Sequence, residues 1–389
     1  MAGFSSQDNI IQALSNGQSF RYDWNKSMNP TTAAIAGEFH MTARGNGNPG
    51  PDALFDTGAN LTFIGVEDDT TSASSIPHGG DVQPTYHKSL ANLSAFTAAA
   101  TTAPCVGVLI DLIGYYRVTT VTTTTAQSTT NTLGYGDTFT ADAGTDIITW
   151  TSTTNIPSNI LTGTRVRLTT TTTLPAGLAL ATDYYVIKLT DSTCSLATSY
   201  ANAVAGTAIN ITDAGTGTHT MSRLLPRHTN GAGVQAIFFN PAATALGAAT
   251  PNLTLAYTNS AQVAARATPG VQPIGKTAAS NSLILYTGTG SGKFNYQHPL
   301  QAGDAGIALI ESIRNTTSYV SGTYTVALIK ELARVPITTL GVAAERDLVN
   351  QLPSLPRIYD GAALYWIVGS STTTPANANF SGHLTTIWN

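Results

Sequence analysis

Charged residues are scarce in this chain of 389 residues. Asp, Glu, Lys and Arg together make up 10% of it, whereas ordinary soluble domains carry roughly 25%. The composition is not membrane-like either, because Thr, Ala, Gly and Ser take the place of the ionic residues. We therefore expect a neutral surface of short, hydroxyl-rich side chains. Such a surface loses little desolvation energy and little rotamer entropy when another protein covers it, which suits a chain packed in an assembly.

Other absences exclude further classes. The net charge is −4 and the pI about 5.9, without the clustered Lys and Arg that phosphate neutralisation needs, so we expect no nucleic-acid partner. No run of about 18 apolar residues predicts a membrane span. The first residues lack the basic start and apolar stretch of a secretory signal, which predicts a protein made in a cytoplasm that stays soluble.

Cysteine is nearly absent. Cys105 and Cys194 lie in unrelated segments, and neither has another Cys or a His at the spacing of metal ligands. No disulfide framework is implied. Cys105 begins an apolar run, and we predict that its thiol is buried and inert.

The residues that are present favour a folded β protein. Hydrophobic residues make up 42% of the chain, with 15 Tyr, 11 Phe and 4 Trp, which conflicts with disorder. No regular alternation of strands and helices appears, so we predict a mainly β fold with an antiparallel β-sandwich or jelly-roll body. Runs rich in branched and aromatic residues, bounded by Gly, Pro, Asn and Asp, predict strands at 59–66, 106–118, 234–239, 252–258, 282–288, 306–313, 322–332, 363–368 and 383–388.

Helical signals are few and local. Residues 5–16 predict a short amphipathic helix capped by Ser5 or Ser6 and ended by Gly17. In 88–100, Leu90 and Leu93 recur at helical spacing, which predicts a second helix. A third is expected over 345–352, ending before Pro353.

A shift in composition marks residues 118–222 as a separate module. The stretch opens with a Thr-rich linker, contains no Glu, and has few basic residues. We predict that it is a small inserted β-sandwich, displayed outward from a discontinuous body domain made of residues 1–117 and 223–389. Its expected strands are 137–141, 146–151, 165–172, 183–189, 194–198, 208–212 and 219–222.

Part of this module resembles a known family. The marks are Leu-Pro-Ala-Gly-Leu at 174–178, Asp-Tyr-Tyr-Val-Ile at 183–187, Leu-Ala-Thr at 196–198 and Asp-Ala-Gly-Thr-Gly at 213–217. In content and spacing they resemble a module of tailed-bacteriophage virion proteins, including tail fibres and head decorations. The segments 253–266 and 354–368 and the end at Trp388 also resemble a phage structural protein. The resemblance implies a virion protein and leaves its position in the particle open.

The sharpest catalytic motif is Asp56-Thr57-Gly58, which resembles the active-site turn of aspartic proteases. That chemistry needs two carboxylates that share one proton. No second Asp-Thr/Ser-Gly occurs in the chain, so only a dimer could supply the partner. A simple turn before the strand 59–66 explains the motif equally well, and we favour the turn.

Two further motifs lack essential parts. Residues 286–294 imitate a phosphate-binding loop, but Thr287 stands where the first Gly is required and Phe294 where a Ser or Thr belongs. We predict a hairpin loop there. His78, Asp81 and His87, with Glu67, Asp68 and Asp69 nearby, fit neither a helix face nor a calcium loop, so we predict a solvated loop. We therefore expect no catalytic residue, no metal ligand and no cofactor.

These observations favour a non-enzymatic phage virion protein, most simply a capsid-associated decoration or minor head protein. Its expected partners are copies of itself, with a trimer as a guess from virion symmetry, and other virion proteins such as the major capsid protein. The alternative is a tail-associated or receptor-binding protein. In that case the module at 118–222 contacts a host glycan, and Trp150, Tyr184 and Tyr185 are the stacking candidates, although at least two of them are expected in the module's core. A dimeric aspartic protease using Asp56 is the third interpretation.

Overall fold

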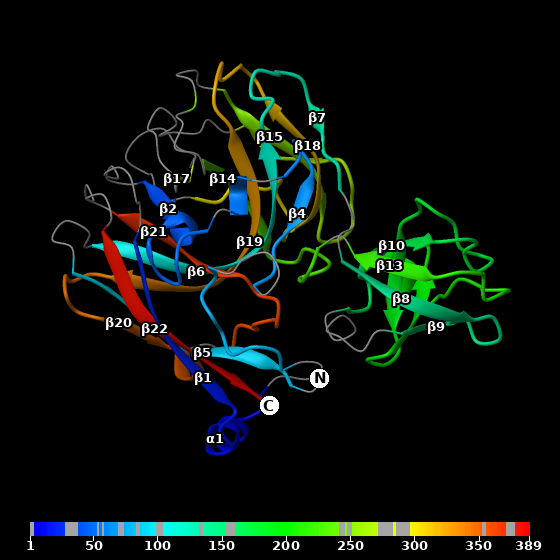
Figure 1. Cartoon of the computed structure of the whole chain (residues 1–389), viewed down its shortest axis with the longest axis horizontal. Coiled ribbons are helices and arrows are strands. Elements are labelled where there is room, and N and C mark those ends of the chain that lie inside the picture. The colour runs from blue at the N-terminus through cyan, green and yellow to red at the C-terminus, as the bar shows by residue number, and fades with distance from the viewer. Residues whose placement is uncertain are drawn as a thin grey trace.

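The computed structural model describes residues 4–27, 38–52, 54–56, 58–68, 74–82, 86–98, 104–131, 135–151, 160–223, 225–240, 246, 251–270, 283–284, 296–351, 355–370 and 378–389. Within these ranges the fold is mainly β, as predicted, and the named strands pair antiparallel throughout. A layered body is joined to a smaller barrel at its side (Figure 1). The helices are short: α1 (Gln7–Ser15), α2 (Tyr200–Val204) and α3 (Leu348–Gln351), with the 3-10 turns η1 (Thr42–Arg44) and η2 (Leu54–Asp56).

A sheet that closes on itself forms the centre of the body. Its order is β19-β14-β17-β2-β21-β6-β4, and β19 also pairs with β6, so that six of the strands complete a ring. Alternate side chains of these strands, among them Phe39, Ile110 and Ile329, fill the inside of the ring. The strands are β2 (Phe39–Met41), β4 (Phe63–Gly65), β6 (Cys105–Val118), β14 (Val234–Asn240), β17 (Leu283–Ile284), β19 (Tyr324–Ile337) and β21 (Leu364–Ser370).

Two outer sheets pack against this ring, each over its own apolar cluster. The five-stranded sheet has the order β20-β5-β22-β1-β3 and buries residues such as Leu93 and Leu384 against Trp366 of the ring. Its strands are β1 (Ser19–Ser27), β3 (Gly47–Asn48), β5 (Lys88–Thr97), β20 (Ala344–Asp347) and β22 (Asn379–Trp388). The four-stranded sheet has the order β16-β15-β18-β7 and packs over Phe238 and Leu328. Its strands are β7 (Gln127–Ser128), β15 (Leu253–Asn259), β16 (Arg266–Ala267) and β18 (Ile307–Asn315).

The strands between Tyr135 and Arg223, where a small β-sandwich was expected, form a closed six-stranded barrel of order β10-β11-β12-β9-β8-β13. They are β8 (Tyr135–Asp142), β9 (Ile147–Trp150), β10 (Arg165–Thr170), β11 (Tyr184–Lys188), β12 (Thr193–Ala197) and β13 (His219–Arg223). Six of the seven strands expected here form. The seventh range, 208–212, is not a strand, although Ile209 N–H donates to the carbonyl oxygen of Leu196. The barrel has its own core, centred on Ile148, Val186 and Leu196.

The barrel begins and ends at one place. Tyr135 and Arg223 are register partners in the β8–β13 pair, so the chain enters and leaves through neighbouring positions. The described residues 118–131 belong to the body: Val121 lies in its core, and β7 pairs with β18. This topology is that of an insertion, while the folding independence of 118–222 stays a prediction.

The predicted helix over 88–100 is wrong, because this segment forms the strand β5. The register between β22 and β5 shifts between Thr385 and Thr386, which face Asn92 and Leu90, so Ala91 is the extra residue of a bulge. The bulge brings Leu90 and Leu93 to the same inner face, and both are fully buried. Their spacing of three residues imitates a helical repeat, and for this reason the sequence pattern predicted a helix.

The two other helix predictions fare differently. Helix α1 is confirmed: Ser6 caps it by accepting a hydrogen bond from Asn9 N–H at 3.2 Å, and Gly17 follows its end with φ +73°. The helix expected over 345–352 is confirmed only in its second half. Residues 344–347 instead pair with β5, and Asp347 Oδ1 then accepts the N–H of Val349 at 3.0 Å as α3 begins.

A buried ion pair ties the loop after the barrel to the ring. Asp111 lies in the middle of β6 and accepts hydrogen bonds from Arg227 Nε at 2.7 and 2.9 Å. The same guanidinium donates to the carbonyl oxygens of Val66 and Leu112, each at 2.6 Å. Burial favours the neutral carboxyl, but Arg227 outweighs it and lowers the pKa of Asp111 to about 2.

Candidate functional site

The motif at Asp56 falls at the edge of the described residues. Asp56 ends the 3-10 turn η2, next to Phe55, which is buried in the ring; the side chain of Asp56 and the whole of Thr57 lie outside the description. Gly58 follows with φ +106°, a conformation that favours glycine. The strand expected over 59–66 forms only at Phe63–Gly65. The imitation phosphate loop at 286–294 lies outside the described residues.

The segment around His78 is packed against the body, which corrects the expectation of a solvated loop. His78 is 1% exposed, and its Nε2 lies 2.9 Å from Asp68 Oδ2 and 3.0 Å from the carbonyl oxygen of Ala362. Nearby, the buried Lys88 forms an ion pair of 3.1 Å with Asp360. Nowhere in the described ranges do three His, Cys, Asp or Glu side chains come together in a way that could hold a metal ion.

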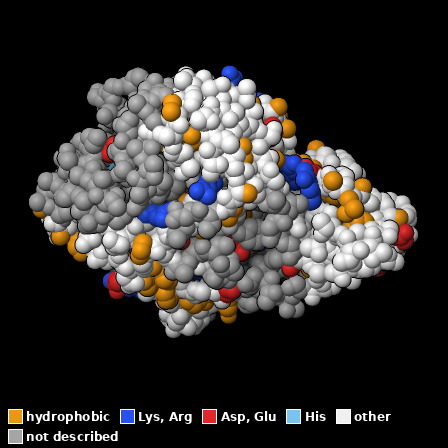
Figure 2. All heavy atoms as spheres, turned by 45° about the horizontal axis from the view of Figure 1, so that its top comes forward, with side chains coloured by type: hydrophobic (Ala, Val, Ile, Leu, Met, Phe, Trp, Pro, Cys, Tyr) orange, Lys and Arg blue, Asp and Glu red, His pale blue; other side chains and the backbone are white. Residues whose placement is uncertain are grey.

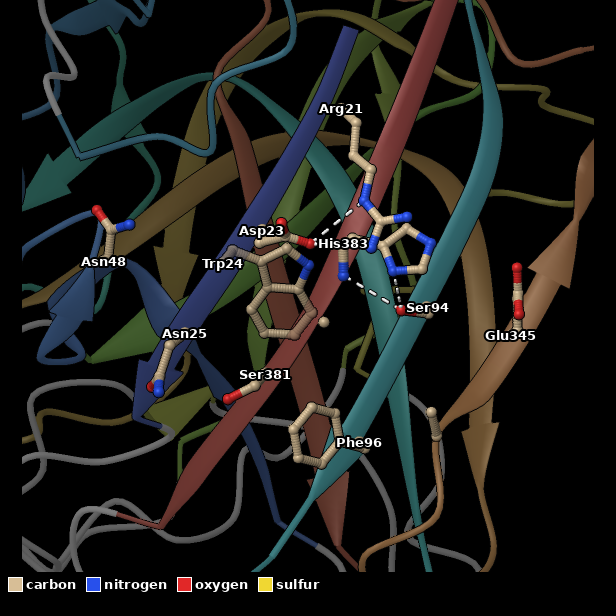
Figure 3. Close-up of a pocket in the computed structure, with 12 residues that line it drawn as sticks. Arg21, Asp23, Trp24, Asn25, Asn48, Ser94, Phe96, Glu345, Ser381 and His383 are labelled. Carbon is tan, nitrogen blue, oxygen red and sulfur yellow. Dashed lines mark hydrogen bonds and ion pairs between the residues drawn. The ribbon is translucent and has the colours of Figure 1, made fainter.

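A candidate site is a groove on the outer face of the five-stranded sheet (Figure 3). Its volume is about 490 Å³, within the range of roughly 300–1,000 Å³ that is typical of small-molecule sites. Strands β1, β22, β5 and β20 supply its walls, with Asn48 from β3 at one side and Glu345 at the other. The residues that line it are Arg21, Asp23, Trp24, Asn25, Asn48, Ser94, Phe96, Ala343, Glu345, Ser381, Gly382 and His383.

Strand register arranges the groove's side chains in transverse rows. Asp23 faces His383, His383 faces Ser94, and Ser94 faces Glu345, so one row crosses four strands. The next row lies two residues further along each strand and consists of Asn25, Ser381 and Phe96. Because alternate residues of a strand point to the same face, the rows share the outer face while Leu93 and Leu384 point into the core.

A directed chain of hydrogen bonds fixes the centre of the first row. Ser94 Oγ accepts the backbone N–H of His383 at 3.2 Å and lies 2.8 Å from His383 Nδ1. His383 Nε2 lies 2.9 Å from Asn92 Oδ1, an oxygen that can only accept, so Nε2 carries the ring proton. Asn92 Nδ2 then donates to Glu345 Oε1 at 2.8 Å. Burial, with a contribution from Arg21, lowers the pKa of His383 and favours this neutral tautomer.

The contact between Ser94 and His383 resembles the start of a nucleophile–base pair, but its hydrogen bonding points to a structural role. The hydroxyl hydrogen is directed to His383 Nδ1, as in such a pair, but the hydroxyl oxygen already accepts a backbone N–H. Ser94 is also 4% exposed. A catalytic serine needs a free approach to its oxygen, so this arrangement positions His383 and supplies no nucleophile.

Gly382 is closely packed between its neighbours. A Cβ at this position would lie 2.0 Å from the carbonyl oxygen of Ser94 and 2.9 Å from Trp24 Cζ2, so the absence of a side chain lets both lie against the strand. Trp24 is 3% exposed and packs against Trp366, with ring centroids 4.8 Å apart and an angle of 35° between the rings. Its Nε1–H has no hydrogen-bond partner among the described residues. An unpaired buried donor of this kind costs about 1–3 kcal/mol.

Sequence reasoning missed this groove, although a signal was present. Residues 20–25 read Phe-Arg-Tyr-Asp-Trp-Asn, in which aromatic and polar residues alternate strictly. This period of two predicts a strand with a polar face, and β1 is that strand. The sequence does not predict that β1 pairs with β22, which comes from the other end of the chain. This pairing completes the rows.

The remaining sequence candidates are buried. Cys105 and Cys194 are free and buried, as predicted for Cys105, and burial raises the pKa of the Cys105 thiol to about 12. In the barrel, Trp150 is 5% and Tyr184 3% exposed, which confirms that two of the three stacking candidates belong to its core. Tyr185 is half-buried.

No protein-family model matches the chain, and no curated protein matches it. Within the described residues the longest helix, α1, has nine residues and is far too short to cross a membrane, which takes about 20.

Proposed function

We propose that this chain is a non-enzymatic structural protein of a tailed-bacteriophage virion, associated with the capsid and working by self-association and by binding to the particle. The resemblance of its sequence to phage virion modules suggests the setting. The observation that carries the proposal is the shortage of ionic groups on its surface.

Some of the few charged residues do not lie on the surface. Eight of the charged residues are buried: Lys26, Glu38, Lys88, Asp111, Asp137, Arg223, Arg227 and Asp360. Figure 2 accordingly shows few blue or red side chains among the described atoms of one face. When another protein covers such a surface, few charged groups lose their water. Little desolvation energy therefore opposes association, and more of the buried area contributes to it.

The shape supports the same proposal. The body buries its apolar side chains in three clusters between the ring and the outer sheets, and the barrel stands beside it (Figure 1). A body that attaches to the particle and a barrel that faces outward fit a decoration protein. The barrel's position also fits the alternative, a tail-associated protein whose barrel contacts the host.

Immunogold electron microscopy tests the proposal. Antibodies raised against the purified chain are applied to intact particles of the phage whose genome encodes it. We expect label on the head. Label confined to the tail supports the alternative role, and particles that carry no label and lack the chain by mass spectrometry overturn the proposal.

A further inference from the structure

We propose that the groove on the outer face of the five-stranded sheet binds a neutral saccharide. The inference does not rest on the proposed virion role. It rests on the geometry of strands β1, β22 and β5, on the charge balance of the groove, and on an aromatic ring beside its polar rows.

The charge balance selects a neutral ligand. The groove contains one guanidinium, that of Arg21, and it is already 3.2 Å from Asp23 Oδ1. The carboxylates of Asp23 and Glu345 outnumber it, so an anionic ligand meets net repulsion. A metal ion finds no cluster of three suitable ligands among the described residues. Sugar hydroxyls both donate and accept, and so they suit a surface on which both kinds of group are exposed.

The available hydrogen-bonding groups are of both kinds. The amide of Asn25 and the hydroxyl of Ser381 have no side-chain partner among the described residues, and Asp23 keeps one oxygen available. Strand pairing holds Asn25, Ser381 and Asp23 on one rigid surface. A site that is preorganised in this way loses little entropy when it binds.

Phe96 supplies the apolar part of the site. It lies in register with Ser381, which separates it from Asn25 in the same row, and is half-buried. The C–H face of a pyranose ring can pack on an aromatic ring while its hydroxyls reach the polar row.

The experiment is isothermal titration calorimetry of the full chain. The probes are neutral glucose, galactose and N-acetylglucosamine oligomers, with a sialylated and a sulfated oligosaccharide for comparison. We expect at least one neutral oligomer to bind. Asp23→Asn and Phe96→Ala should each weaken that binding roughly tenfold, which corresponds to one charge-assisted hydrogen bond or one aromatic contact.

The matched control is Asp191→Asn. Asp191 is also an exposed carboxylate in an ion pair, 2.9 Å from Lys188, but it lies in the barrel. This variant should bind like the wild type. Thermal unfolding of each variant shows that the fold is retained. The proposal is overturned if no neutral oligomer binds at millimolar concentration, if only the anionic probes bind, or if both groove variants keep wild-type affinity.

Discussion

A single buried histidine should make stability depend on pH. His298 is 1% exposed, its Nε2 lies 2.9 Å from Thr268 Oγ1, and its ring packs edge-on against Phe238. Burial lowers its pKa to about 3, against about 6.5 in an unfolded chain. The unfolded state therefore binds the proton more readily, so stability is complete above pH 6.5 and falls as the pH drops toward 3.

We expect His298 to account for a loss of about 2 kcal/mol in unfolding free energy between pH 7 and pH 5. Urea unfolding of wild type and His298→Gln at both pH values measures it. The variant should lose correspondingly less on acidification, whatever its stability at pH 7. Equal losses in the two proteins would contradict the assignment.

The ion pair of Asp111 with Arg227 should be costly to break from one side. Asp111→Ala leaves the guanidinium buried and removes the acceptor of Ala363 N–H, which lies 3.1 Å from Asp111 Oδ1. The expected cost is about 3–5 kcal/mol of unfolding free energy. Asp23→Ala, which breaks the exposed pair with Arg21, is the control and should cost about 1 kcal/mol or less. Similar costs for the two variants would show that burial does not set the energy of the Asp111 pair.

At the scale of elements, the N-cap of α1 leads to a prediction about stability. Ser6 Oγ accepts Asn9 N–H, while the neighbouring Ser5 places its hydroxyl 2.7 Å from Asn9 Oδ1 without bonding to the backbone. Ser6→Ala should cost about 1 kcal/mol of stability and Ser5→Ala much less. Chemical denaturation of both variants checks this. Loss of equal size in both would mean that Ser6 is not the effective cap.

Strands were predictable from the sequence where branched and aromatic residues are concentrated, and they were mistaken where a local irregularity intervened. The ranges 106–118 and 234–239 match β6 and β14 closely, because branched apolar residues fill them almost continuously. Strand β5 was mistaken for a helix because the bulge at Ala91 changed the spacing of its inward residues. Pairing partners could not be read at all: β1 and β22 are adjacent in space but stand at opposite ends of the sequence.

The same limit applies to the candidate site. Each groove strand contributes polar residues that look like an ordinary solvated face. Their meaning depends on register, which places Asp23, His383, Ser94 and Glu345 in one line. Motif reasoning instead considered Asp56 and the loop around His78, which are local in sequence, and favoured a turn and a solvated loop there.

For the whole molecule, the barrel should be removable. Its first and last residues, Tyr135 and Arg223, are paired neighbours, and the Cα atoms of such pairs lie about 4.5–5.5 Å apart. Replacing residues 136–222 with a short Gly-Ser linker should therefore leave a body that unfolds cooperatively. Circular dichroism and thermal unfolding measure this. A body that aggregates or loses its cooperative transition would show that the barrel is needed for folding.

The central claim is that this sparsely charged surface is made to be covered by protein. Sedimentation velocity of the purified chain over micromolar to near-millimolar concentrations tests it most directly. We predict a homo-oligomer of one defined size whose population increases with concentration. It should persist in high salt, because few ionic contacts hold it together. A chain that remains monomeric over the whole range would contradict the claim.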